Sequence, residues 1–338
     1  MSFVGPNLTL AQSDRKRRGA ARANLGLRLG GDSIWSGRER ERDMQSELKV
    51  AVLGTGLMGF PMARNLCSAG FDIAVWNRSA DKAASLAAFG ARVAASAADA
   101  VAGADVVISM VSDGAAVLAL AGQEDLRATL GQGAIWIDMS STKPEEARAL
   151  ATSLQQIGVQ VLDAPVSGGT RGAEQASLAI MVGGAPEVLE HARSVLQAMG
   201  RPVHVGPTGA GQLAKLANQT IVAITIGAVA EATLLLEAGG ADVAVVRDAL
   251  KGGFADSTIL QQHGARMSAR DFSPGGPSHL QVKDLDNALA EAGGLSLVLP
   301  TASTIRDRFQ RYVTDLDGGE RDHSGLYEEL LDLNGLKS

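Results

Sequence analysis

The sequence has a single cysteine and no stretch that resembles a membrane span. Cys67 has no second cysteine to pair with, so an internal disulfide is excluded and a reducing compartment, the cytoplasm, is indicated. Within the most apolar segment, only the 15 residues from Leu216 to Ala230 are free of charge. A helix needs roughly 20 such residues to cross a membrane, so we expect no transmembrane segment and no membrane partner.

The chain also lacks the positive excess of a polyanion-binding protein, because its net charge is −6. Its basic residues gather at the start, where residues 1–43 hold nine Lys or Arg against five Asp or Glu. This segment has no apolar core of a secretory signal. A mitochondrial presequence, a nucleic-acid arm or a start codon placed ahead of Met44 would each fit. Because its composition cannot form a core, we expect residues 1–47 to be a disordered extension, without a nucleic-acid partner.

Metal-ligand spacing is absent as well. The chain has five histidines, and none stands at the short intervals of a zinc site. They are His191, His204, His263, His279 and His323. The sequence therefore predicts no metal site.

What the sequence does contain is a regular alternation of strand-like and helical segments from Leu48 to about Gly206. The strand-like runs include "LKVAVL", "FDIAVWN", "DVVISMV", "AIWIDMS" and "VQVLDAP". This alternation predicts a parallel sheet covered on both faces, a Rossmann-type doubly wound α/β domain over residues 48–208. After Gly206 only helical patterns follow, beginning with a long helix from about Gln212 to Ala238. Residues 209–335 should form an all-α C-terminal domain.

The first strand leads into "GTGLMG", which has the spacing of a dinucleotide-binding turn. Gly54 permits the tight turn, Gly56 lets the backbone approach a pyrophosphate, and Gly59 lets the helix pack closely on its strand. The helix that follows presents free N–H groups to the phosphates. We therefore expect the whole loop to bind a nicotinamide dinucleotide, through Gly54, Thr55, Gly56, Leu57, Met58 and Gly59.

The end of the second strand bears on the choice of cofactor. NAD enzymes usually place Asp or Glu there to hold the ribose hydroxyls, whereas this chain has Asn77, Arg78 and Ser79. No carboxylate stands there to repel a 2′-phosphate, and the planar guanidinium of Arg78 can pair with one. NADP is therefore favoured, although Arg78 stacked on the adenine would also permit NAD.

Two further features suggest a substrate site. Ser167, Gly168 and Gly169 follow a strand and offer a hydroxyl and freely placed N–H groups, which suit a carboxylate, although a simple turn would also contain glycines. Lys215 begins the apolar helix, with Asn218 on the same face. Such a lysine either extends its ammonium to water or loses hydration and, with a lowered pKa, serves acid–base chemistry.

Five segments together resemble the β-hydroxyacid dehydrogenase family, in order and in spacing. They are "GTGLMGFPMARNL", "DMSSTKP", "DAPVSGG", "GAGQLAKLANQ" and "HLQVKDLDNAL", and the resemblance extends from Leu48 to about Gly335. The family includes 3-hydroxyisobutyrate dehydrogenase and 2-hydroxy-3-oxopropionate (tartronate semialdehyde) reductase. "GGFADSTIL", "LPTASTI" and "DHSGLYEEL" are more similar to the second branch.

The resemblance implies roles for individual residues. Lys215 matches the catalytic lysine, Asn218 its substrate-orienting partner, and the loop from Ser167 to Gly169 the site for the substrate's carboxylate end. The remaining matches lie on the cofactor side of the cleft: Val111, Ser112, Ser141 and Lys283.

The resemblance also implies a reaction, the transfer of a hydride between NADP(H) and a small semialdehyde acid, with tartronate semialdehyde as the first candidate substrate. The long apolar helix suits a subunit interface, so we expect a homodimer or homotetramer. A 3-hydroxyisobutyrate or sugar-acid dehydrogenase is the nearest alternative. A non-catalytic cofactor-binding scaffold with a basic nucleic-acid arm is an alternative of another class, against which the paired Lys215 and Asn218 argue.

Overall fold

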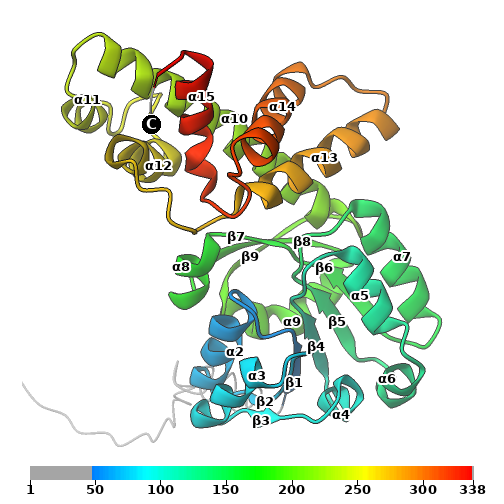
Figure 1. Cartoon of the computed structure of the whole chain (residues 1–338). Helices are drawn as coiled ribbons and strands as arrows, with labels where there is room; N and C mark the ends of the chain where they lie inside the picture. Colours follow the sequence, from blue (N-terminus) through cyan, green and yellow to red (C-terminus); the bar gives the residue numbers. More distant parts are fainter. Residues whose placement is uncertain (1–47, 337–338) are drawn as a thin grey trace, which may run out of the picture. The chain divides into compact units, whose positions relative to one another are not determined.

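The computed structural model describes residues 48–336, and the expected disordered extension over 1–47 lies outside the described residues. Among these, nine strands form one sheet in the order β3-β2-β1-β4-β5-β6-β8-β7, with β9 paired to β8 (Figure 1). The strands are β1 (Lys49–Leu53), β2 (Asp72–Trp76), β3 (Arg92–Val93), β4 (Val106–Ser109), β5 (Ile135–Asp138), β6 (Gln160–Asp163), β7 (Val166–Ser167), β8 (Leu178–Gly183) and β9 (Gly200–Gly206).

The direction of the strands confirms the Rossmann-type sheet and modifies it at one edge. The strands from β3 to β6 are all parallel, which requires a crossover between each pair. β8 runs antiparallel to β6 and β7, so the sheet is mixed at this edge. The reversal follows the turn at Gly168 and Gly169, both at positive φ, where glycine costs least.

Helices cover both faces of the sheet, as the alternation predicts. They are α2 (Gly59–Ser68), α3 (Asp81–Ala84), the 3₁₀ helix η1 (Ser85–Phe89), α4 (Ala97–Val101), α5 (Gly114–Ala121), α6 (Glu124–Thr129), α7 (Pro144–Gln155), α8 (Gly169–Glu174) and α9 (Pro186–Gln197). Successive residues of β1 serve opposite faces: Val52 belongs to the core cluster that contains Leu66 of α2, whereas Leu53 belongs to the separate cluster that contains Trp136 of β5. This doubly buried sheet explains why its strands read as continuous apolar runs.

The second half of the described chain is helical, as predicted. It contains α10 (Ala210–Ala238), α11 (Val243–Ala249), α12 (Thr258–Ala269), α13 (Ser278–Gly294), α14 (Pro300–Asp315), the 3₁₀ helix η2 (His323–Gly325) and α15 (Leu326–Leu333). We propose the domain boundary at residues 208 and 209, just before α10 begins. α10 packs against α12, α13, α14 and α15, with its Gly227 directly against Ile305 of α14.

α10 itself is less buried than its apolar sequence suggests. By length and composition alone its 29 residues could cross a membrane, although only 15 of them form the charge-free run. It contacts α12, α13, α14, α15 and β8, and nine of its residues are buried. Other large apolar side chains of α10 are exposed, namely Leu213, Ile221 and Leu235.

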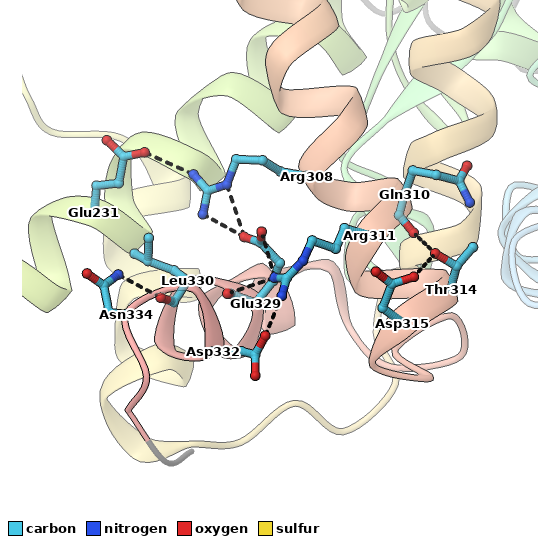
Figure 2. A network of polar contacts seen from close by, with 10 residues as sticks. All are labelled: Glu231, Arg308, Gln310, Arg311, Thr314, Asp315, Glu329, Leu330, Asp332 and Asn334. Atoms are coloured by element: carbon cyan, nitrogen blue, oxygen red, sulfur yellow. Dashed lines mark hydrogen bonds and ion pairs between the residues drawn. The ribbon is translucent and has the colours of Figure 1, made fainter.

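A chain of alternating charges ties α10, α14 and α15 together (Figure 2). The carboxylate of Glu329 is 1% exposed and accepts hydrogen bonds from Arg308 at 2.9 Å and Arg311 at 3.2 Å. Arg308 also pairs with Glu231 of α10 at 2.9 Å, and Arg311 pairs with Asp332. Glu231 thus has a structural partner, which explains its position in an otherwise apolar helix.

Candidate active site

The turn after β1 has the geometry that a dinucleotide requires. Gly54 lies at φ +101° and donates its N–H to the carbonyl of Trp76 at 2.8 Å. A Cβ on Gly54 would overlap the carbonyl of Met110, and one on Gly59 would overlap the carbonyl of Gly54. These two glycines therefore bring three backbone segments together at the carboxyl end of the sheet.

The middle glycine differs from its neighbours. A Cβ on Gly56 would meet no atom within 4 Å, so the space beside its backbone is open. The hydroxyl oxygen of Thr55 is buried and has no hydrogen-bond partner among the described residues. Because α2 begins at Gly59 with free N–H groups and no acidic side chain in its first turn, this loop fits a bound pyrophosphate.

Asn77 braces this loop from the end of β2. Its side-chain oxygen accepts the N–H of Thr55 at 3.0 Å, and its side-chain amide donates to the carbonyl of Ser79, also at 3.0 Å. Both polar ends of Asn77 are thereby engaged with the backbone. Arg78 is exposed beside it, and its guanidinium is the one positive group in the turn 77–79.

The segments that follow β4 and β5 contribute further residues to the same carboxyl edge of the sheet. The N–H of Val111 donates to the hydroxyl of Ser140 at 3.0 Å, and Lys283 of α13 lies 3.5 Å from the carbonyl of Ser141. The neighbouring Thr142 has a buried hydroxyl with no partner among the described residues. In a doubly wound sheet, ligands bind outside the carboxyl ends of the strands, where these residues lie.

Lys215 reaches this edge from the second turn of α10. Its ammonium nitrogen donates to the carbonyl of Val166 at 3.0 Å and to the side-chain oxygen of Gln219 at 3.0 Å. The lysine therefore lies directly beside Ser167, the first residue of the second glycine loop. Burial lowers the pKa of Lys215 and the nearby Lys283 lowers it further, whereas Asp284 opposes the shift.

The direct partner of the lysine on the helix is Gln219, which the sequence reasoning missed. Asn218 makes no hydrogen bond with Lys215, and its amide donates to the Gln219 oxygen at 2.9 Å. The Gln219 amide in turn donates to Asp284 of α13 at 2.6 Å. A spacing of four on a helix is as favourable as three, so "KLANQ" alone offered both candidates. Asp284 lies 65 residues further on, and no local pattern connects it with the lysine.

The start of α10 is held against the sheet by two buried side chains. The carboxylate of Asp163, at the end of β6, accepts N–H groups from Gly209 at 2.8 Å and Gln212 at 2.9 Å. The side chain of Gln212 accepts from Thr142 N–H at 3.0 Å and donates to the Ser140 carbonyl at 2.9 Å. These four bonds set the distance between Lys215 and the strand ends.

The structure thus brings most of the predicted site residues to one edge of the sheet. The Gly54 loop, Asn77, Val111, Ser141, Lys283, Lys215 and Ser167 are linked by the contacts above. The predicted cofactor residues Met58, Ser112 and Ser79 flank these segments. Leu57 is 81% exposed, and Gly168 and Gly169 are also exposed.

Comparison with known proteins identifies the family of this chain. Residues 49–209 match the NAD binding domain of 6-phosphogluconate dehydrogenase, and residues 209–330 match the NAD-binding domain of NADP-dependent 3-hydroxyisobutyrate dehydrogenase. Over 287 residues the chain is 40% identical to 2-hydroxy-3-oxopropionate reductase of Escherichia coli K12, which covers 84% of this chain and 97% of that protein. The chain belongs to the β-hydroxyacid dehydrogenase family.

Other members of the family are similar over the same region. NAD-dependent L-serine dehydrogenase of Pseudomonas aeruginosa is 36% identical over 293 residues, which is 84% of this chain and 98% of that protein. The structure of 3-hydroxyisobutyrate dehydrogenase of Mycobacterium tuberculosis with L-serine superposes with a TM-score of 0.77 at 33% identity. It covers 84% of this chain and 99% of the other. As a β-hydroxyacid dehydrogenase, the chain is an NAD(P)-dependent oxidoreductase that acts on CH–OH donors.

Proposed function

We propose that this β-hydroxyacid dehydrogenase is a cytoplasmic, NADPH-preferring reductase of 2-hydroxy-3-oxopropionate, with Lys215 as its general acid. The observation that carries the catalytic assignment is the position of the Lys215 ammonium, 3.0 Å from the Val166 carbonyl and beside the loop at Ser167. The substrate assignment rests on the 40% identity to the E. coli reductase. The segments "GGFADSTIL" and "DHSGLYEEL" support it.

The bound reduced nicotinamide would supply the hydride to the aldehyde carbon. Lys215, as an ammonium, donates a proton to the carbonyl oxygen as negative charge develops there. Gln219 and the Val166 carbonyl hold the ammonium in place, and the lowered pKa eases loss of the proton. In the reverse direction neutral Lys215 accepts the hydroxyl proton.

The remaining polar groups of the cleft fix the substrate. We assign Ser167 and the backbone N–H groups of Gly168 and Gly169 to the carboxylate, because both glycines lie at positive φ at the start of α8. Asn218 is assigned to the substrate hydroxyl from the same helix face as Lys215. On the cofactor side we assign Lys283 to the nicotinamide half, and Val111, Ser112 and Ser141 to further contacts with the cofactor.

The cofactor preference follows from the turn after β2. Asn77 is neutral and occupied with the loop backbone, so no carboxylate opposes a 2′-phosphate. Arg78 is exposed there and can pair with the phosphate as a planar fork. The P. aeruginosa relative is NAD-dependent by name, whereas the family model matched by residues 209–330 is named for an NADP-dependent enzyme, and we assign the choice between the two cofactors to this turn.

A substrate panel tests the proposal. The purified protein is given NADPH or NADH with 2-hydroxy-3-oxopropionate, and in the reverse direction NADP⁺ or NAD⁺ with glycerate, 3-hydroxyisobutyrate or L-serine. We expect the highest kcat/KM for NADPH with 2-hydroxy-3-oxopropionate. A higher value for 3-hydroxyisobutyrate would establish the nearest alternative, a dehydrogenase of that acid. No turnover with any pair would favour the non-catalytic scaffold.

We further propose that the protein is a homo-oligomer, a dimer or tetramer, in which α10 contributes to the subunit contact. Ile221 and Leu235 are 66% and 74% exposed in the single chain, and both lie on this helix. Light scattering of wild type and Ile221→Lys gives the test, with Val93→Lys, a change on the edge strand β3, as matched control. We expect only the Ile221 variant to dissociate, and a monomeric wild type would contradict the proposal.

A further inference from the structure

Two histidines and an aspartate from distant parts of the sequence converge within the helical half. His263 belongs to α12, whereas Asp322 and His323 lie at the start of η2, about 60 residues later. The Nε2 atoms of the two histidines are 2.7 Å apart, and their ring centroids are 4.7 Å apart. One ligand atom from each of the three residues lies within 4.8 Å of the others.

The carboxylate of this cluster is held in a fixed orientation. Asp322 is 3% exposed, and its two oxygens accept the N–H groups of Gly276 and Ser324, each at 3.0 Å. The hydroxyl of Ser324 donates to it as well. A carboxylate oxygen has further lone pairs beyond these bonds, so Asp322 remains able to serve as a ligand without reorganising.

The two imidazoles are hydrogen-bonded to each other through their Nε2 atoms. Each ring turns its Nε2 toward the other rather than toward a carbonyl, and the Nδ1 of His263 has no hydrogen-bond partner among the described residues. In a neutral pair only one Nε2 can carry a hydrogen, and the other offers its lone pair.

We propose that His263, His323 and Asp322 bind one divalent transition-metal ion, with Zn²⁺ as the first candidate. Two imidazole nitrogens and one carboxylate oxygen are a donor set that suits zinc, with water in the fourth position. Tetrahedral ligands at about 2.0–2.1 Å place two nitrogens roughly 3.3 Å apart. The two Nε2 atoms therefore need to separate by about 0.6 Å from the 2.7 Å observed, and ligand atoms that lie up to 4.8 Å apart need to approach by up to about 1.5 Å.

The ion would join α12 to the segment that begins α15. The same segment holds the start of α13, because the N–H of Ser278 donates to the Arg321 carbonyl at 2.9 Å and the N–H of His323 donates to the Gly276 carbonyl, also at 2.9 Å. Among the described residues, no hydrogen bond links His263 or His323 with Lys215. The metal site is thus a structural one, and the proposal stands independently of the substrate assignment.

Arg266 limits the affinity of this site. Its Nε lies 3.5 Å from the Asp322 carboxylate, and its guanidinium also donates to the Ser273 carbonyl. The arginine therefore competes with a cation for Asp322 and repels it. Removing the positive charge in Arg266→Gln should tighten metal binding, an effect opposite to that of removing a ligand.

The test uses the full chain without an affinity tag, after dialysis against a chelator. Zn²⁺ binding is measured by calorimetry at pH 7.5, and Co²⁺ binding by visible absorption, which reports coordination geometry. We expect one ion per chain, with affinity at least about tenfold weaker in His263→Gln and in His323→Gln. His191→Gln, which changes an exposed histidine elsewhere, should bind as wild type does, and Arg266→Gln more tightly.

The outcomes are distinguishable even where a variant is less stable. Circular dichroism and NADPH binding show whether each variant is folded, and thermal unfolding with excess Zn²⁺ should shift upward in wild type by at least about 2 °C. A wild type that binds no stoichiometric ion would overturn the proposal. Equal affinity in wild type and in both folded histidine variants would overturn it as well.

Discussion

We predict that alanine substitutions at two glycines of the same loop impair the protein in different ways. Replacing Gly59 by alanine places a Cβ against the Gly54 carbonyl, whose carbon would be 3.0 Å away and whose oxygen would be closer still. Replacing Gly56 by alanine places a Cβ in open space, with no protein atom within 4 Å. The first change should therefore destabilise the fold, and the second should weaken cofactor binding.

The expected magnitudes follow from these surroundings. Neither the Gly54 backbone nor the start of α2 can give way easily, because the N–H of Gly54 is bonded to Trp76. Overpacking of this kind costs about 1–3 kcal/mol of unfolding free energy. For Gly56→Ala the change in stability should stay within about 0.5 kcal/mol, as for a surface position. The methyl group occupies the approach to the pyrophosphate, so NADPH affinity should fall at least about tenfold, or 1.4 kcal/mol.

The assay combines urea unfolding without cofactor and NADPH binding by fluorescence on both variants. We expect Gly59→Ala to lower the unfolding free energy and Gly56→Ala to leave it unchanged while weakening NADPH. If Gly56→Ala bound NADPH as tightly as wild type, the open space beside Gly56 would not be the phosphate site. If Gly59→Ala were fully stable, the close approach of helix and strand would not matter.

Three further predictions concern charge. Arg78→Ala should weaken NADPH by roughly 1.5–3 kcal/mol and NADH little, because it removes one charge-assisted contact to the 2′-phosphate; equal losses for both cofactors would refute that contact. The rate of aldehyde reduction should fall as pH rises through the lowered pKa of Lys215, because the ammonium is the acid, while the rate of alcohol oxidation should rise. If neither rate changed in this way below about pH 10, the ordinary range of a lysine pKa, the assignment of Lys215 would be contradicted. Arg308→Leu should cost about 3 kcal/mol in urea unfolding, since it leaves the 1% exposed Glu329 carboxylate with a single partner. Glu329→Gln should lower the unfolding free energy by less than Arg308→Leu does, because Arg308 keeps its ion pair with Glu231 and Arg311 keeps its ion pair with Asp332. If Glu329→Gln were the more destabilising change, Glu329 would not be the residue that holds the network.

The parts of the fold that could be predicted are those set by local pattern. The apolar runs of β1, β4 and β5 are buried on both faces, and the run of α10 is long and uninterrupted, so each is visible in the sequence. β9 was missed because "GRPVHVG" contains a proline, a charge and exposed side chains, which is typical of an edge strand. The reversal of β8 depends on the turn at Gly168 and Gly169, and an alternation of strands and helices does not specify it.

The residues of the candidate site likewise fall into those that a local sequence pattern reveals and those that it does not. Lys215 was visible because a charge in an apolar helix is a local anomaly, and the Gly54 loop because its glycine spacing is local. Gln219 lies only four residues from Lys215, but its role depends on Asp284, which reaches it from another helix. His263 and His323 are 60 residues apart, so spacing along the chain could not bring them together. Tertiary pairing, which no short segment encodes, supplies these contacts.

The most direct test of the account is the turnover of Lys215→Met, measured as kcat for NADPH-dependent reduction of 2-hydroxy-3-oxopropionate beside NADPH binding by fluorescence. The variant should fold and bind NADPH with near wild-type affinity, because the Gly54 loop lies outside α10. Its turnover should fall at least roughly 10²-fold, the usual effect of removing a general acid. Lys215→Arg should not restore activity, because the guanidinium does not release its proton near neutral pH. Turnover within about tenfold of wild type in Lys215→Met would remove this lysine from the mechanism. Lys283, which lies 3.5 Å from the Ser141 carbonyl, would then be the candidate proton donor.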